Sequence, residues 1–129
     1  MNQEIIELPV IEFLKHEKGF NETVVDNIKL PANLVIGKDN FISKVSDNSL
    51  IEAGVLKDDY IIVDRCNVAK NGSIIIGIIN NNKLILARYF KNEKDIELKF
   101  QDESNDIEFL SKNTFKLIGK IKGNFRVIK

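Results

Sequence analysis

The chain has one cysteine, Cys66, one histidine, His16, and no tryptophan among its 129 residues. A lone cysteine excludes an internal disulfide and suits a reducing compartment, and we expect Cys66 to be a small residue of the core or of a strand end. We expect His16, the only histidine, on a surface loop. A Ser-His-Asp triad therefore cannot be built around any serine of this chain.

An excess of charge of either sign is also missing, because Lys plus Arg number 19 and Asp plus Glu number 19. This balance gives no electrostatic case for nucleic-acid binding by the chain itself. No apolar run approaches the ~20 residues of a membrane span, and residues 1–7 lack the basic cluster of a signal peptide. Zinc-ligand spacings and glycine-rich phosphate loops are missing too. We therefore expect a cytoplasmic chain without membrane contact, metal or cofactor.

The residues that are present suffice for one compact domain over residues 1–129, since 43% of them are apolar. Residues 74–79 form a continuous β-branched run, which is typical of a strand buried on both faces. Asn80-Asn81-Asn82 then predicts a turn that brings the chain back as a hairpin. The predicted strands cover residues 60–64, 74–79, 83–90, 95–100, 115–121 and 125–128, with tight turns at 71–72 and 122–124.

Only one short helix is predicted, over residues 49–53, with Gly54 as its C-terminal stop. Many short strands with so little helix predict a mainly β, partly open, barrel-like architecture. Upstream of these elements, residues 5–14 form an extended apolar piece that Pro9 interrupts, and Gly19 leads into a polar stretch.

The most specific pattern lies in residues 41–63, which read FISKVSDNSLIEAGVLKDDYIIV. A strand leads into a turn with Ser49, a short helix ends in Ala-Gly, and an acidic turn leads into the next strand. This order resembles the signature of the LexA, UmuD and phage-repressor family of self-cleaving serine–lysine peptidases. The resemblance implies the partly open β fold of that family's C-terminal domain. Looser similarity lies at residues 8–11, 71–75, 86–90 and 115–123.

The family's chemistry needs a serine and a neutral lysine that takes the serine's proton, and burial can lower the pKa of a lysine from ~10.4 by several units. The match implies that Ser49 holds the nucleophile's position, at a helix start where backbone amides help to hold an oxyanion. Asp47 stands where a glycine is usual, and Leu50 replaces a methionine of similar volume. A second interpretation stays open, because Ser49-Leu50-Ile51-Glu52 is also a helix-capping box.

The same match places Ala87 where the family has its catalytic lysine, and alanine cannot accept a proton. Lys83 lies four strand steps from that position, or ~13 Å, and we expect Lys44 to point to solvent, so neither is predicted to replace the base. Losing a general base costs about 10²- to 10⁴-fold in rate. We therefore predict that this chain does not cleave itself at a useful rate. Whether Ala87 is natural or engineered stays open.

The family cuts its own chain between a small residue and a glycine, in a loop that folds into the active site. The resemblance assigns residues 1–30 to an N-terminal arm and this cleavage-loop region. Counting from Leu8-Pro9 leads to His16-Glu17, whereas the glycine leads to Lys18-Gly19. Neither pair offers a small residue before the cut. The alternative is that residues 16–19 are a solvated loop.

The resemblance implies the C-terminal dimerisation domain of a LexA-like transcriptional repressor that acts in the DNA-damage (SOS) response. Its implied partners are a second copy, joined through C-terminal strands that include Phe125 and Val127, and a RecA filament. DNA would be bound only through a separate N-terminal domain, absent from this chain. The alternatives are a UmuD-like accessory subunit of an error-prone DNA polymerase, a peptidase that acts on other proteins, and a β-rich interaction module. An ordinary core role for residues 115–128 is also open.

Overall fold

The computed structural model describes residues 4–35 and 39–127, and these are mainly β, as the sequence predicts. They form a nine-stranded sheet in the order β2-β1-β3-β4-β9-β5-β6-β7-β8. The pairing is antiparallel except between β1 and β3, which run parallel. The strands are β1 Ile5–His16, β2 Gly19–Pro31, β3 Asn40–Lys44, β4 Tyr60–Arg65, β5 Ser73–Ile79, β6 Lys83–Lys91, β7 Ile96–Lys99, β8 Ile107–Leu110 and β9 Phe115–Phe125.

Helical structure is confined to 3₁₀ turns in the described residues: η1 Ala32–Leu34, η2 Ile51–Ala53 and η3 Lys112–Thr114. The predicted helix near Ser49 is therefore present but shorter, and Gly54 ends it in the left-handed conformation with φ +88°. None of the helices in the described part of the chain is long and apolar enough to cross a membrane.

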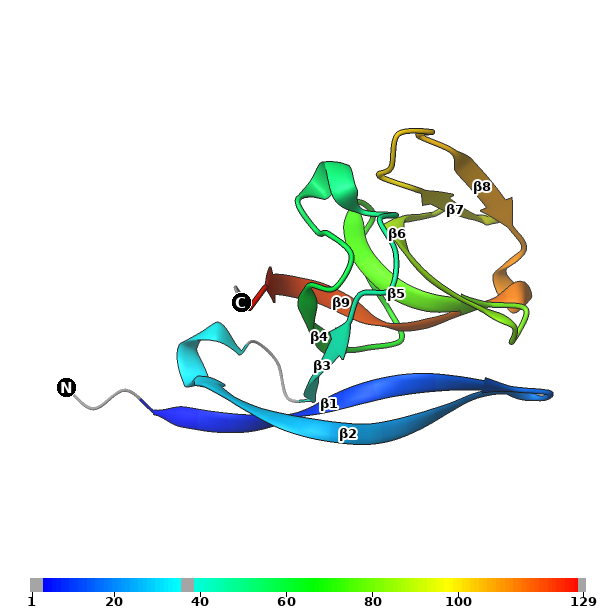
Figure 1. Ribbon diagram of the computed structural model, residues 1–129. Helices are drawn as coiled ribbons and strands as arrows, with labels where there is room; N and C mark the ends of the chain where they lie inside the picture. The colour runs from blue at the N-terminus through cyan, green and yellow to red at the C-terminus, as the bar shows by residue number, and fades with distance from the viewer. Residues whose placement is uncertain (1–3, 36–38, 128–129) are drawn as a thin grey trace.

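A long two-stranded ribbon, β1–β2, lies beneath the other strands, and Figure 1 shows it along the bottom of the molecule. The sequence predicts the extended apolar piece that became β1 but not β2. The reason is that β2 is an edge strand whose side chains are mostly exposed, so it has no alternating apolar pattern. The predicted N-terminal arm is thus a hairpin attached to β3 at Val10–Ile42.

The isoleucine run of β5 is buried because β6 and β9 flank it and apolar clusters cover both faces. Ile76 belongs to a cluster with Val45, Leu50 and Leu86, which lies under the Ser49 segment. Ile75 belongs to a second cluster with Ala87. Sequence analysis predicts this strand and the following Asn80–Asn82 turn correctly, and Asn80 and Asn81 take the positive φ values that such a turn uses.

The predicted turn at residues 122–124 is wrong, because β9 runs without interruption from Phe115 to Phe125. The register against β4 shifts between Ile62 and Val63, so a bulge absorbs the irregularity that the sequence suggests is a turn. Val127 follows the strand, while residue 128 of the predicted last strand lies outside the described residues. Gly119 allows the close β4–β9 contact, since a Cβ there would lie 2.7 Å from the carbonyl oxygen of Asp64.

Candidate active site

Ser49 lies on the segment that joins β3 to β4, and this segment is fixed at both of its ends. Near its start, Leu50 is completely buried in the core, which fits a side chain that substitutes for methionine by volume. Gln101 holds the backbone of the segment on both sides of Leu50. The Gln101 N–H donates to the Ser49 carbonyl at 2.9 Å, and the Glu52 N–H donates to the Gln101 carbonyl at 2.8 Å. The turn is therefore anchored to the residues that follow β7.

The hydroxyl of Ser49 donates a hydrogen bond to Asp47 Oδ1 at 2.7 Å, and the Ser49 N–H donates to the same oxygen at 3.0 Å. Asp47 thus makes an Asx turn, in agreement with its predicted turn role. The predicted capping box is wrong, since η2 has Leu50 as its N-cap and no side-chain cap hydrogen bond. The Ser49 hydroxyl is hydrogen-bonded to Asp47 instead. A three-residue 3₁₀ turn also has few free backbone N–H groups that a side chain could cap.

A cavity of about 460 Å³, the Ser49 cavity, opens beside this turn. Asp47 and Ser49 lie on its wall with Lys83, Leu84 and Ile85 of β6, and the segment around β8 completes the lining with Phe100, Asp102, Asp106, Ile107 and Glu108. The structure places Lys83 in the lining of the same cavity as Ser49, which the sequence argument, limited to distances along one strand, does not address. Lys83 is nevertheless exposed, and the hydrogen bond of the Ser49 hydroxyl goes to Asp47.

Ala87 is completely buried on β6, opposite Ile75 of β5. It shares a strand face with Lys83 and Ile85, and the Ser49 cavity is lined by these two residues and by Leu84 of the other face of β6. Its neighbours in the core cluster are apolar, among them Tyr89 and Leu98. A side chain at this position is therefore surrounded by low-dielectric groups, which is the environment that lowers the pKa of a lysine.

The candidate cleavage residues lie at the tip of the β1–β2 hairpin. His16 pairs with Gly19, Glu17 and Lys18 form the turn, and the Lys18 N–H donates to His16 Nδ1 at 3.1 Å. His16 is exposed, as expected, but ends a strand instead of lying in a loop. A Cβ on Gly19 would lie 3.8 Å from the Asn81 carbonyl, so the tip lies beside the β5–β6 turn. None of these described residues lines the Ser49 cavity.

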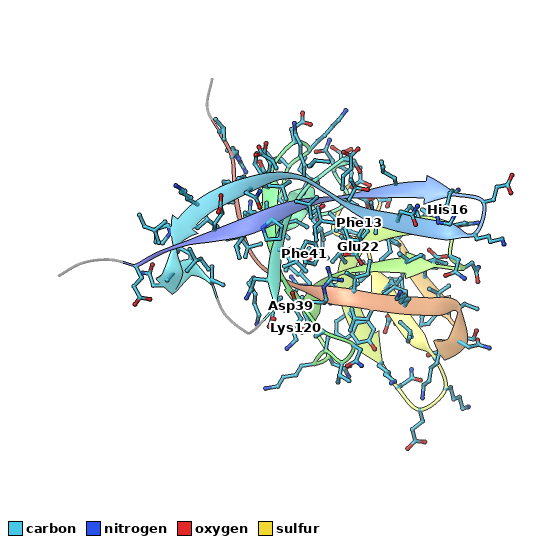
Figure 2. The ribbon with its side chains drawn as sticks, turned by 90° about the horizontal axis from the view of Figure 1, so that it is seen from below. Phe13, His16, Glu22, Asp39, Phe41 and Lys120 are labelled. Atoms are coloured by element: carbon cyan, nitrogen blue, oxygen red, sulfur yellow. The ribbon has the colours of Figure 1, made fainter. Side chains whose placement is uncertain are left out.

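The hairpin is fastened to the rest of the sheet by an aromatic and an ionic contact (Figure 2). Phe13 of β1 packs on Phe41 of β3 with ring centroids 5.9 Å apart. Arg65 of β4 lies over the Phe41 ring at 4.7 Å and binds Glu22 of β2 through two hydrogen bonds of 2.6 and 3.2 Å. Asp39 approaches the same guanidinium at 3.5 Å. These contacts hold the hairpin in a position in which none of the four described tip residues lines the Ser49 cavity.

The other end of the Ser49 segment is held by Asp59, whose side chain is only 2% exposed. Its carboxylate accepts hydrogen bonds from Arg126 Nε and Nη2 at 2.8 and 2.9 Å, from Asn124 Nδ2 at 3.0 Å and from the Leu56 N–H at 2.9 Å. The Arg126 hydrogen bonds hold the pKa of Asp59 below its ordinary value although burial opposes this. Sequence analysis did not identify this network.

Cys66 and Lys44, the other residues that the sequence analysis singles out, lie where they are expected. Cys66 follows β4 directly and is partly buried, which confirms its expected place at a strand end. Lys44 is exposed, as expected, with its Nζ 6.0 Å from the centre of the Tyr60 ring. Among the described residues, no cluster of His, Cys, Asp and Glu side chains has the arrangement of a metal site.

Comparison with known proteins identifies the family of this chain. Residues 9–122 match the Peptidase S24-like family. The chain is 35% identical to a LexA repressor of Clostridioides difficile, covering 99% of this chain and 62% of that protein. It is 35% identical to a LexA repressor of Clostridium novyi (81% and 52%) and 31% identical to one of Bacillus cytotoxicus (96% and 61%). The chain therefore spans about three fifths or less of these relatives' length, and it belongs to the S24 peptidase family as a LexA-like peptidase domain.

Proposed function

We propose that this chain is the C-terminal domain of a LexA-like transcriptional repressor and that its self-cleavage site is silent. The observation that carries the proposal is the completely buried Ala87 of β6, the strand whose first residues line the Ser49 cavity. Alanine has no proton acceptor, and Ser49 donates its hydroxyl hydrogen to Asp47 instead of to an amine. A carboxylate on an exposed turn is a far weaker base than a neutral lysine amine.

The test restores both missing parts of the reaction. Ala87→Lys supplies the amine in an apolar environment, and Lys18→Ala places a small residue before Gly19 at the hairpin tip. We expect the double variant to cut itself between residues 18 and 19 at about pH 10, at least about 10²-fold faster than the unmodified chain. Gel electrophoresis over time and the fragment masses measure the rate and the position of the cut.

Matched variants identify the groups responsible. Adding Ser49→Ala must abolish the restored cleavage, and Ala87→Met tests whether a long side chain fits the buried position without supplying a base. Lys83→Met is needed because Lys83 shares the cavity with Ser49. The proposal is wrong if the unmodified chain cuts itself as fast as the restored variant. It is also wrong if the unmodified chain cuts itself and Lys83→Met abolishes that cleavage.

We also propose that two copies pair through the C-terminal half of β9. β5 pairs with residues 115–120 of β9 and β4 pairs with residues 119–125, so only Gly119 and Lys120 are paired on both sides. Beyond Lys120, β4 is the only described strand that pairs with β9, up to the Tyr60–Phe125 pair, so no described strand occupies the second edge of residues 121–125. Val127, which is 64% exposed, extends this edge with an apolar side chain. Such an edge supports a two-fold symmetric contact.

The dimer is tested by sedimentation equilibrium in the micromolar range. We expect Val127→Asp to shift the chain toward the monomer. The matched control is Val68→Asp, since Val68 is also highly exposed but lies outside the strands. A strictly monomeric parent chain, or equal effects of the two substitutions, contradicts pairing through β9.

The repressor assignment rests on the relatives, which are LexA repressors and extend beyond the part that this chain matches. They favour a repressor over a polymerase accessory subunit. In the whole protein we place DNA binding on a segment outside residues 1–129, with a RecA filament as the activating partner of relatives that cleave. A purified 1–129 chain should therefore give no gel shift with operator-length duplex DNA at physiological salt.

A further inference from the structure

The two edges of the sheet differ in how they are protected. The β2 edge carries Lys29 and Pro31, and a register shift between Val10 and Ile11 interrupts the pairing of β1 with it. Charge, proline and bulges are the usual means by which a strand edge avoids further pairing. The β8 edge, at the upper right of Figure 1, has neither lysine nor proline. No described strand pairs with its second side.

The outer face of β8 is apolar where a solvent-exposed strand would usually be polar. Phe109 is 62% exposed and Ile107 is 48% exposed, and both point away from the core face. Their partners across the β7–β8 pair are Glu97 and Lys99. A strand with open backbone groups and exposed large apolar side chains is the arrangement to which an extended polypeptide adds.

Both Ile107 and, on the opposite face of β8, Glu108 line the Ser49 cavity, and the charge of this cavity is negative. The cavity is lined by Asp47, Asp102, Asp106 and Glu108 against the single cation Lys83. The Ser104 hydroxyl donates to Asp102, and this hydrogen bond keeps the pKa of Asp102 below its ordinary value, so the carboxylate stays charged at neutral pH. A strand added to β8 would direct every second side chain toward these carboxylates.

We propose that the free edge of β8 docks an extended polypeptide strand that alternates apolar and basic residues. Its backbone pairs with β8, its apolar side chains cover Ile107 and Phe109, and its basic side chains face Glu108 and the carboxylates of the Ser49 cavity. The charge argues against a second copy as the occupant, because pairing two β8 edges brings two sets of the same carboxylates together. The docking does not depend on whether Ser49 has a base.

The probe is an acetylated and amidated heptapeptide of alternating lysine and valine, titrated into the ¹⁵N-labelled chain at about 0.15 M salt. This ionic strength screens charges beyond about 8 Å, so only nearby carboxylates contribute strongly. We expect shifts of the amide signals of residues 106–110 and of the Ser49 turn, with a dissociation constant of about 0.1 mM, because a short edge buries little surface. A glutamate–valine peptide and a peptide with the same lysines and valines in two blocks serve as controls.

Variants of the chain separate local pairing from general attraction. We expect Glu108→Lys to weaken the lysine–valine peptide about five- to tenfold and Glu108→Gln about two- to threefold. Glu103→Lys makes the same charge change in the loop before β8 but outside the cavity, and should change the affinity less than twofold. Because Glu108→Gln keeps the size of the side chain, it reports on binding even if the lysine variant folds poorly.

Three results overturn the proposal: equal binding of the glutamate–valine peptide, equal effects of Glu103→Lys and Glu108→Lys, or amide shifts that map to another strand. Self-association that Glu108→Lys strengthens would identify a second copy as the occupant, which also contradicts it. None of these outcomes bears on the restored self-cleavage of the Ala87→Lys chain.

Discussion

The two ends of the segment between β3 and β4 each contain an aspartate that accepts several hydrogen bonds, yet they are built differently. At the first end, Asp47 is exposed and binds only Ser49, a residue two positions away. At the second end, Asp59 is buried and binds Asn124 and Arg126, more than sixty positions along the chain. One end is a local turn and the other is a tertiary anchor.

The two aspartates differ in how much the folded state depends on their hydrogen bonds. A buried carboxylate depends on every donor around it, because an uncompensated charge in the interior is costly. An exposed turn depends on little, because water replaces whatever is lost. We therefore expect the Asp59 hydrogen bonds to contribute more to the stability of the domain than the exposed hydrogen bonds between Asp47 and Ser49.

The largest expected effect comes from removing the cation at the anchor. Arg126→Ala leaves Asp59 buried with only Leu56 and Asn124 as donors, and we expect the free energy of unfolding to fall by about 2–3 kcal/mol. Urea titration followed by circular dichroism measures the change. Lys122→Ala, which removes an exposed cation of the neighbouring strand β9, should stay within about 0.5 kcal/mol. Equal effects of the two substitutions would mean that Asp59 is not the anchor.

A smaller effect is expected from acid. Because the folded pKa of Asp59 lies below its unfolded value, near 3.8, the stabilisation is complete above that value and is lost as the pH falls through the folded pKa. The parent chain should therefore lose stability more steeply below about pH 4 than Asp59→Asn does. Urea midpoints between neutral and acid pH show this difference. Parallel curves for the two proteins would exclude Asp59 as the group that titrates.

The difference between the two ends also explains what the sequence could predict. The Ser49 turn and the Gly54 stop follow from short stretches of consecutive residues, so a local pattern is enough to find them. The interest in Ala87 comes from the family resemblance, which also rests on a short stretch. The bonds from Arg126 to Asp59 join residues that no local pattern connects. The same reason accounts for Lys83, whose place in the Ser49 cavity depends on how β6 lies against a distant turn.

The strands that sequence analysis missed, β2 and β8, are the two edges of the sheet. Central strands such as β5 are buried on both faces and therefore read as continuous apolar runs. Edge strands expose most of their side chains, so their composition follows solubility and binding instead of core packing. Ile107 and Phe109 are apolar but exposed, and the alternation in Ile107-Glu108-Phe109 is too short for a strand to be inferred from it.

The smallest effect is expected at Ser49 itself. Ser49→Ala removes one hydroxyl hydrogen bond to the exposed Asp47 and keeps the backbone bond to the same oxygen, so we expect a loss of less than about 1 kcal/mol. Ser46→Ala, an exposed serine three positions earlier, is the control. If the ends are independent, the losses from Ser49→Ala and Arg126→Ala add to within about 0.5 kcal/mol in the double variant. A larger coupling would mean that the hydrogen bonds between Asp59 and Arg126 also position Ser49. The Ser49 site would then depend on residues next to β9, the strand that we propose joins two copies.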